Sequence, residues 1–138
     1  MLSNTVTRRI EWGDCDPAGI VFNPNFFRWF DHGTVMLFEA AGWPKPAMLK
    51  EFNAAGTPVV EARAIFKSPC AYGDDVEVTS TVADVRNSSF DVKHTLINSG
   101  KLCVEGFETR VWTIRDSETG RLKSAPLPEI VASRFQAD

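Results

Sequence analysis

The sequence predicts an α+β fold in which an antiparallel β-sheet wraps one long helix. The segment from about Pro24 to Ala41 carries large apolar residues at spacings of three and four, which is the period of a helix. After Gly56 the apolar residues follow a period of two, and short turn sequences separate the resulting strand segments. One apolar helix followed by a run of antiparallel strands is typical of a helix packed against a single sheet.

The first half of the chain is predicted to contain one strand, one loop and the long helix. Thr5 to Trp12 is the strand, and the Asp-, Pro- and Gly-rich stretch from Gly13 to Gly19 ends it as a loop. Pro24 suits the first turn of the helix, while Gly42 and Pro44 end it. The polar residues of this helix form only a narrow stripe, so we predict that it is buried on most of its sides; the stripe consists of Arg28, Asp31, His32 and Glu39.

The second half is predicted to consist mainly of strands joined by tight turns. A short helix is expected first, at Ala47 to Phe52. The strand candidates are Pro58–Lys67, Val76–Arg86, Ser89–Ile97 and Lys101–Arg115. Turn sequences rich in Asp, Asn, Ser and Gly favour hairpins over helical crossovers, so the sheet should be mainly an antiparallel meander. Leu122 is expected in a last strand, and Pro128 to Phe135 in a C-terminal helix.

Length and charge limit what the protein can be. The 138 residues, 43% hydrophobic and 24% charged, fit one globular domain over residues 1–138. The net charge of −3 argues against a nucleic-acid partner, which calls for a basic face. No apolar run approaches the ~20 residues of a membrane span, and Met1 to Trp12 lacks the apolar stretch of a signal peptide, so no membrane partner is expected. Three cysteines without a C-x-x-C pair favour a reducing compartment, and we expect a cytoplasmic location.

Asp14 and Asp16 lie in the loop directly before the long helix, where a carboxylate can meet free backbone N–H groups. The N–H groups of the first helical turn, around Asn23 to Phe26, lack partners within the helix and carry partial positive charge. They can stabilise the oxygen that becomes negative when a thioester carbonyl is attacked, while a nearby carboxylate attacks the carbon or activates water. The alternative is that both aspartates are turn or cap residues, which Asp14 fits better than Asp16.

Four motifs of this chain form a recognisable set. They are G-D-C-D-P-A-G-I-V at Gly13 to Val21, N-P-N-F-F-R-W-F-D at Asn23 to Asp31, G-T-P-V-V at Gly56 to Val60 and S-P-C-A-Y-G-D-D-V-E-V at Ser68 to Val78. Together they resemble the signature of the 4-hydroxybenzoyl-CoA thioesterase family, with D-x-D-P-A-G as the most specific part. The resemblance implies the hot-dog fold, in which a curved antiparallel sheet wraps a long central helix, and it implies a homodimer or homotetramer.

The resemblance also implies an enzyme that hydrolyses an acyl- or aryl-CoA thioester to the free acid and CoA. In this family the second aspartate of the motif is catalytic, which assigns to Asp16 the role of nucleophile or of general base toward water. The oxyanion would be held by the backbone N–H at Asn23, in agreement with the helix argument. Because an acyl-CoA substrate carries its own activation, no metal and no cofactor are expected.

Five further residues are candidates for substrate binding. Asp31 and His32 lie on the polar stripe of the helix, and His32 has an acid–base role or a subunit contact as alternatives. Gly56 and Thr57 match a family segment that borders the acyl pocket, and their alternative is a turn before a strand. Arg86, at a hairpin turn, resembles the place where the family keeps basic residues for the CoA phosphates, although no further cation directly follows it here.

Other readings of these residues lead to different functions. A non-catalytic domain that binds an acyl ligand would have the same fold and would release no thiol. A hot-dog hydratase or dehydratase generally has a histidine in the loop before the helix, and Gly13 to Val21 has none. A metal site built from the loop aspartates with Asp31 and His32 matches no metal-binding spacing. His94 alternates with apolar residues and is expected to be a hydrogen-bonded core or interface histidine.

Overall fold

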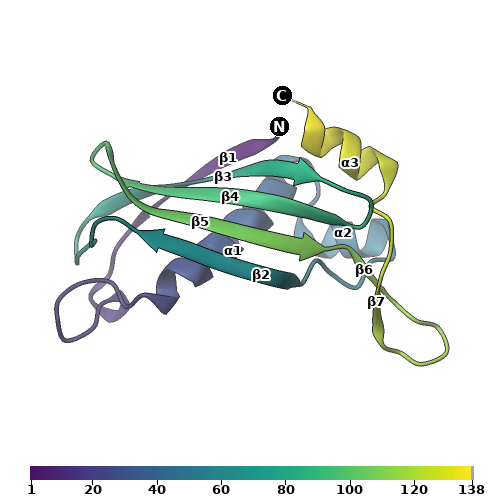
Figure 1. Ribbon diagram of the computed structural model, residues 1–138, viewed down its shortest axis with the longest axis horizontal. Coiled ribbons are helices and arrows are strands. Elements are labelled where there is room, and N and C mark those ends of the chain that lie inside the picture. The colour runs from purple at the N-terminus through teal and green to yellow at the C-terminus, as the bar shows by residue number, and fades with distance from the viewer. Residues whose placement is uncertain (138) are drawn as a thin grey trace.

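The computed structural model describes residues 1–137 as an α+β fold (Figure 1). The strands are β1 (Ser3–Arg9), β2 (Val59–Phe66), β3 (Asp75–Val85), β4 (Ser89–Asn98), β5 (Lys101–Val111), β6 (Thr113–Arg115) and β7 (Leu122–Ser124). The helices are the short 3-10 helix η1 (Trp12–Asp14) and the α-helices α1 (Pro24–Ala40), α2 (Lys45–Glu51) and α3 (Glu129–Gln136). The predicted fold class is confirmed. The predicted domain end at Asp138 lies outside the described residues.

The main sheet is antiparallel and has the strand order β1-β3-β4-β5-β2. Strands β3, β4 and β5 form the predicted meander. Strand β2 pairs with β5 instead of β3, so the chain crosses to the other side of the sheet between Phe66 and Asp75. As a result β2 is an edge strand, and within the described chain its outer side has no partner strand.

The predicted strand Lys101–Arg115 is divided at Trp112. Trp112 and Thr113 are both buried, at 1% and 5% exposure, whereas a flat strand turns successive side chains to opposite faces. The chain therefore bends here, and Thr113 leaves the main sheet to pair with Ser124 in the hairpin β6–β7 (Figure 1).

Strand β1 ends at Arg9, before the predicted end at Trp12. Glu11 and Asp14 form a reciprocal capping box around η1, in which the Glu11 N–H donates to Asp14 Oδ2 at 2.9 Å. Trp12 is 72% exposed, so its apolar character does not reflect burial.

Helix α1 packs against one face of the sheet and leaves its other side open. Phe30 stacks on His94 with ring centroids 4.8 Å apart. On the opposite side of the helix Arg28 and His32 are exposed. The prediction of a helix buried on most sides is wrong for the single chain, because no second layer covers the outer side of α1 in residues 1–137.

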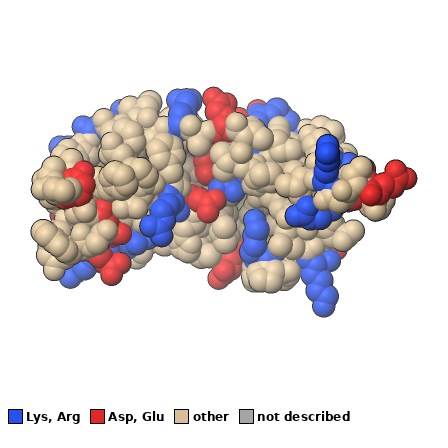
Figure 2. All heavy atoms as spheres, turned by 90° about the horizontal axis from the view of Figure 1, so that it is seen from below, with Lys and Arg blue, Asp and Glu red and all other residues tan. Residues whose placement is uncertain are grey.

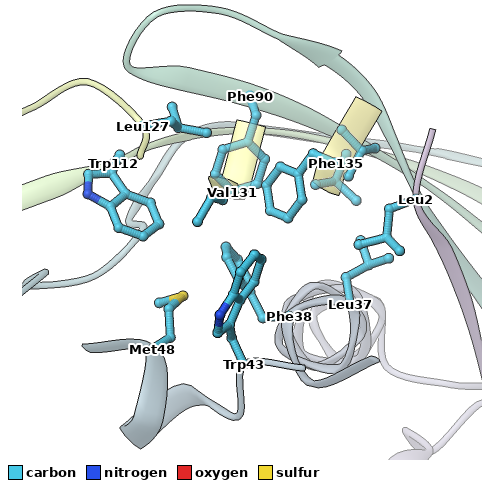
Figure 3. Packing of buried hydrophobic residues seen from close by; sticks show 12 residues of the cluster. Leu2, Leu37, Phe38, Trp43, Met48, Phe90, Trp112, Leu127, Val131 and Phe135 are labelled. Carbon is cyan, nitrogen blue, oxygen red and sulfur yellow. The ribbon is translucent and has the colours of Figure 1, made fainter. Parts of the chain in front are cut away.

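Two clusters of buried residues fix α1 to the sheet. Figure 3 shows the first, in which Phe38 lies 6.0 Å from Phe90 and 5.1 Å from Phe135 between ring centroids. Leu2 donates a backbone hydrogen bond of 2.9 Å to Phe135, so the two ends of the described chain lie side by side. The second cluster lies under the first turns of α1 and includes Phe26. Burial of each large apolar side chain stabilises the fold by roughly 1.5–3 kcal/mol. The second cluster therefore holds the start of the helix against the sheet.

Gly106 sets how closely the helix approaches the sheet, because a Cβ at this position would lie 2.5 Å from the Phe30 ring. Gly106→Ala is therefore expected to lower the free energy of unfolding by about 1–3 kcal/mol through overpacking. Chemical denaturation measures the change, with Gly13→Ala as control, since a Cβ at Gly13 meets no atom within 4 Å. Equal stability of the two variants would contradict the close approach.

Candidate active site

The loop Gly13–Val21 is held in shape by its own backbone. The Asp16 N–H donates to Ile20 O at 3.0 Å, and the Gly19 N–H donates to Asp16 O at 2.9 Å. Gly19 has a φ of 82°, in the region that favours glycine, which allows this tight turn. Val21 N–H then donates to Cys70 O at 2.9 Å, so the loop is tied to the segment that follows β2. These bonds fix the position of Asp16.

The Asp16 carboxylate has one oxygen in use and one free. Oδ1 accepts a 2.8 Å hydrogen bond from the Ala18 N–H, which is a local turn contact. Oδ2 accepts no hydrogen bond from any residue of the described chain, and the residue is half-buried. The turn contact orients the carboxylate, and the second oxygen is available for chemistry.

Asp14 has a structural position. Its Oδ2 accepts from the Glu11 N–H, and its carbonyl oxygen accepts from Asn25 Nδ2 at 2.9 Å and from the Phe22 N–H at 3.0 Å. Asp14 therefore joins η1 to the start of α1. This is the turn or cap position that the sequence favours for Asp14 over Asp16.

The start of α1 offers a free backbone donor at Asn23. Pro24, the first helical residue, has no N–H, and the Asn25 and Phe26 N–H groups donate to Phe22 O and Asn23 O. The Asn23 N–H donates to no residue in the described part of the chain, and the Asn23 side chain makes no capping bond. A free N–H at a helix start is a site for negative charge.

A cavity of about 300 Å³ opens beside this helix start. It is mostly apolar; its lining residues are Ile20, Val21, Asn23, Phe26, Phe66, Lys67, Ser68, Pro69 and Cys70. Burial and a hydrogen bond with Cys103 raise the pKa of the Cys70 thiol to about 12, so this thiol is protonated and is a poor nucleophile.

One stripe of α1 starts at Asn23, which lines the cavity. Asn23, Phe27 and Asp31 lie four residues apart and so share one side of the helix. The facing side of β2 carries the small residues Ala62 and Ala64, which lie in the same sheet rows as Glu108 and Gly106. These residues of α1 and β2 are together called the acyl groove, because the acyl pocket expected from the family resemblance would lie between them, from Asn23 to Asp31.

Gly56 and Thr57 lie at the Asp31 end of the acyl groove. Arg110 links Asp31 to Thr57, since it donates to Asp31 Oδ1 at 2.7 Å and to Thr57 O at 3.0 Å. Gly56 has a φ of 151°, and its carbonyl accepts from the Thr113 N–H and hydroxyl at 3.0 and 2.8 Å. The structure thus brings three of the predicted substrate residues together.

His32 and Asp31 both border a second cavity of about 490 Å³, whose other lining residues are Arg8, Glu11, Asp14, Arg28 and Trp29. No group of three or more His, Cys, Asp or Glu side chains in residues 1–137 is arranged to hold a metal ion. None of the helices described for this chain has the length and apolar character needed to cross a membrane.

Arg86 is engaged by its own hairpin. Its guanidinium donates to Asp84 at 2.7 Å, to both oxygens of Asp91 at 2.6 and 3.0 Å, and to the Ser89 hydroxyl at 2.8 Å. The hydrogen bond from Arg86 lowers the pKa of Asp91 despite partial burial. Two carboxylates therefore already balance this cation.

Comparison with known proteins decides the family. The model of the thioesterase-like superfamily matches residues 10–135. The chain belongs to this superfamily. It is 33% identical over 132 residues to the 4-hydroxybenzoyl-CoA thioesterase of Pseudomonas sp. (strain CBS-3), which covers 91% of this chain and 92% of that protein. The predicted family, and the prediction of an enzyme that hydrolyses thioesters, are confirmed.

Solved thioesterase structures share the fold of this chain. A 4-hydroxybenzoyl-CoA thioesterase with one aspartate replaced by asparagine, in complex with 4-hydroxybenzoyl-CoA, matches with a TM-score of 0.89 and 31% identity over 98% of this chain and 99% of that one. A gentisyl-coenzyme A thioesterase matches with a TM-score of 0.81 and 30% identity over 96% and 98% of the two chains. These matches confirm the hot-dog fold.

A buried pair of charged residues in this thioesterase was not predicted from its sequence. Glu108 and Arg110 are buried in β5, at 6% and 4% exposure, and they face α1. The signal was present, because the period of two places both residues on the same strand face as Val104 and Gly106. Charged residues in a core position indicate a paired network.

Proposed function

We propose that this thioesterase hydrolyses the CoA thioester of an aromatic acid, using Asp16 and the backbone N–H of Asn23. One observation carries the proposal: Asp16 Oδ2 and the Asn23 N–H, at the two ends of one short segment, both lack hydrogen-bond partners in residues 1–137. Acyl transfer requires such a carboxylate and such a donor, and the fold uses neither elsewhere. The cavity lined by Asn23 would give the substrate access to the helix start.

The thioester carbonyl would lie at the start of α1 with its oxygen toward the Asn23 N–H, where the helix dipole also favours negative charge. In one route, Asp16 Oδ2 attacks the carbonyl carbon, the C–S bond breaks to release CoA, and water hydrolyses the acyl–aspartate anhydride. In the other, Asp16 takes a proton from the water that attacks the carbonyl, the C–S bond breaks, and the proton passes to the released CoA thiolate. Both routes give the free acid and CoA, and the proposal includes both.

An aromatic acyl group suits the acyl groove. Phe26 and Phe66, 5.8 Å apart between ring centroids, line the cavity at its Asn23 end, and Phe27 lies on the same side of α1 as Asn23 and Asp31. Asp31 lies eight positions after Asn23, or roughly 12 Å at 1.5 Å per residue, which leaves room for a ring between the reacting carbonyl and the Asp31 carboxylate. Asp31 Oδ2 accepts no bond from the described chain, so it can accept one from a ring hydroxyl.

The groove residues agree with the substrates named for the relatives, 4-hydroxybenzoyl-CoA and gentisyl-CoA, whose acyl groups are aromatic. Gly56 and Thr57 would border the far end of the ring through their backbone. Thiol release from aromatic, short-chain and long-chain acyl-CoA tests the proposal. Turnover should be fastest with the aromatic thioesters, whereas binding without thiol release would identify a non-catalytic acyl-binding domain.

The CoA phosphates would be bound by cations near the cavity mouth. On the face of the molecule in Figure 2, Lys and Arg side chains are interspersed with Asp and Glu. Phosphate binding on this face would therefore depend on individual cations and not on a continuous basic patch. Lys67 lines the cavity, is 47% exposed at its side chain, and has one ion pair of 3.4 Å with Glu105. Arg86 remains a candidate, but a phosphate there must compete with Asp84 and Asp91.

Lys67→Gln is therefore expected to raise KM for acyl-CoA about 3–10-fold with little change in kcat, because a single exposed charge–phosphate contact contributes on the order of 1 kcal/mol. Arg86→Gln should raise KM by less than about threefold, because Asp84 and Asp91 already pair with Arg86. Steady-state kinetics at low and high salt measure both effects. The opposite ranking would place the nucleotide at the β3–β4 hairpin.

We also infer that two copies of the chain pair through β2. This edge strand exposes Val59, Val60, Ile65 and Phe66 at 40%, 61%, 45% and 46%. An exposed apolar edge strand is a template for a second strand unless something covers it. A second copy related by a two-fold axis would extend the sheet and close the open side of the acyl groove. His32, on the outer side of α1, is kept as a candidate for further subunit contact in a tetramer.

A further inference from the structure

A chain of buried hydrogen bonds runs through the core between the sheet and α1. Ser80 Oγ lies 2.7 Å from His94 Nδ1, and His94 Nε2 lies 2.7 Å from Glu108 Oε1. The Thr34 hydroxyl of α1 donates to the same Glu108 oxygen at 2.7 Å. All four residues are at most 6% exposed. This part of the chain of bonds occupies one oxygen of Glu108.

The other oxygen of Glu108 leads toward the acyl groove. Arg110 donates to Glu108 Oε2 at 2.8 Å and to Asp31 Oδ1 at 2.7 Å from the same nitrogen, and its other terminal nitrogen donates to Thr57 O at 3.0 Å. The Arg110 side chain is 5% exposed, whereas that of Asp31 is 61% exposed. The bonds therefore pass from the core to a carboxylate that solvent or substrate can reach.

Glu108 is ionised at neutral pH. Burial raises the pKa of this carboxyl, but the hydrogen bond from His94 and the charge of Arg110 outweigh burial and lower it to about 2. Arg110 is thus fixed on one side by a full negative charge. A charged donor held between two carboxylates has little freedom to rotate.

Packing alone does not account for this arrangement. A buried ion pair stabilises a core no better than apolar residues of similar volume in many proteins, because both charges lose their hydration. Two buried polar atoms, Arg110 Nε and Thr57 Oγ1, also lack hydrogen-bond partners in residues 1–137, which lowers the stability gained. The feature that apolar residues could not replace is the pair of contacts to Asp31 and Thr57.

We propose that Arg110 is a positioning residue that orients the Asp31 carboxylate and the Thr57 carbonyl at the far end of the acyl groove, with Glu108 as its anchor. Arg110 occupies Asp31 Oδ1 and leaves Oδ2 directed to the substrate. The proposal rests on the proposed function in one respect, which is that the acyl group reaches Asp31. Arg110 thereby sets the preference for acyl groups that carry a hydroxyl donor, without contact with the reacting carbonyl.

The test compares 4-hydroxybenzoyl-CoA with benzoyl-CoA in wild type and Arg110→Lys. Lysine keeps the charge beside Glu108 but lacks the planar fork that reaches Asp31 and Thr57 together. The ratio of kcat/KM for the two substrates should fall about tenfold, mainly through the hydroxylated one, because one hydrogen bond to a charged group is lost. An equal loss for both substrates, or an unchanged ratio, would overturn the proposal.

A double-mutant cycle separates positioning from a general loss of structure. Asp31→Asn should lower the same ratio, and Arg110→Lys should have no further effect on the ratio in the Asp31→Asn background. Ser80→Ala is the matched control, because it removes a buried bond at the far end of the same network, on the other oxygen of Glu108. It should lower the melting temperature and leave the ratio unchanged. The positioning role would be wrong if the effects of Asp31→Asn and Arg110→Lys on the ratio were additive. It would also be wrong if Ser80→Ala lowered the ratio, because any damage to the core would then lower it.

Binding of the free acids keeps the test independent of turnover. Calorimetry with 4-hydroxybenzoate and benzoate should show the same dependence on Arg110. If wild type releases no thiol but prefers the hydroxylated acid in an Arg110-dependent manner, the proposed hydrolysis fails and the positioning role stands. If thiol is released and neither ratio depends on Arg110, the positioning role fails alone.

Discussion

Asp16→Asn is expected to lower kcat for thioester hydrolysis about 10²–10⁴-fold, the range supplied by a positioned general base, and further if Asp16 is the nucleophile. An asparagine oxygen can still accept the Ala18 N–H, which Asp16 Oδ1 accepts at 2.8 Å, so the loop should keep its shape. The free oxygen is replaced by an amide nitrogen that neither attacks a carbonyl nor takes a proton. Thiol release from an aromatic acyl-CoA measures the loss, and KM should change little.

Asp14→Asn serves as the control for damage to the loop. Asp14 accepts from the Glu11 N–H and helps to hold η1, so its replacement should lower the melting temperature and leave kcat within about tenfold of wild type. Full turnover by Asp16→Asn would remove Asp16 from the mechanism. A larger loss of kcat in Asp14→Asn than in Asp16→Asn would move the catalytic role to Asp14.

The fold was largely predictable because the local signals agree with the tertiary structure. The helix period in α1, bounded by Pro24 and Gly42, and the period of two in β3 to β5 each correspond to an observed element. The place of β2 was not predictable, because pairing with β5 depends on contacts between distant segments and the loop after Phe66 resembles a hairpin turn in sequence. The break at Trp112 likewise follows from burial of two successive residues, which propensity does not report.

The candidate site was predictable where its chemistry is local and not where it depends on distant partners. The loop at Asp16 and the helix start at Asn23 are adjacent in sequence, so their proximity follows from the motif. Arg86 looked available because its ion pair with Asp91 forms only when β3 and β4 pair. The link from Arg110 to Asp31 joins residues 79 positions apart, and only the packing of α1 on β5 brings them together.

Val60→Asp is expected to separate the proposed dimer and to abolish most of the activity. Val60 is 61% exposed on the outer edge strand β2, and a two-fold axis would bring two new carboxylates close together in a desolvated interface. The second copy is proposed to close the open side of the acyl groove, so its loss would expose the bound acyl group to water. We expect a change from dimer to monomer by sedimentation velocity, with kcat/KM lowered at least about tenfold.

Ile130→Asp is the matched control, because Ile130 is 59% exposed on α3, and α3 packs against β3, away from β2. It introduces the same charge at an apolar residue of similar exposure and should leave both the mass and the activity unchanged. A dimer that persists in Val60→Asp would move the subunit contact away from β2. A fully active monomer would show that one chain closes its own acyl groove, and the role given to the second copy would then be wrong even if the strands pair as proposed.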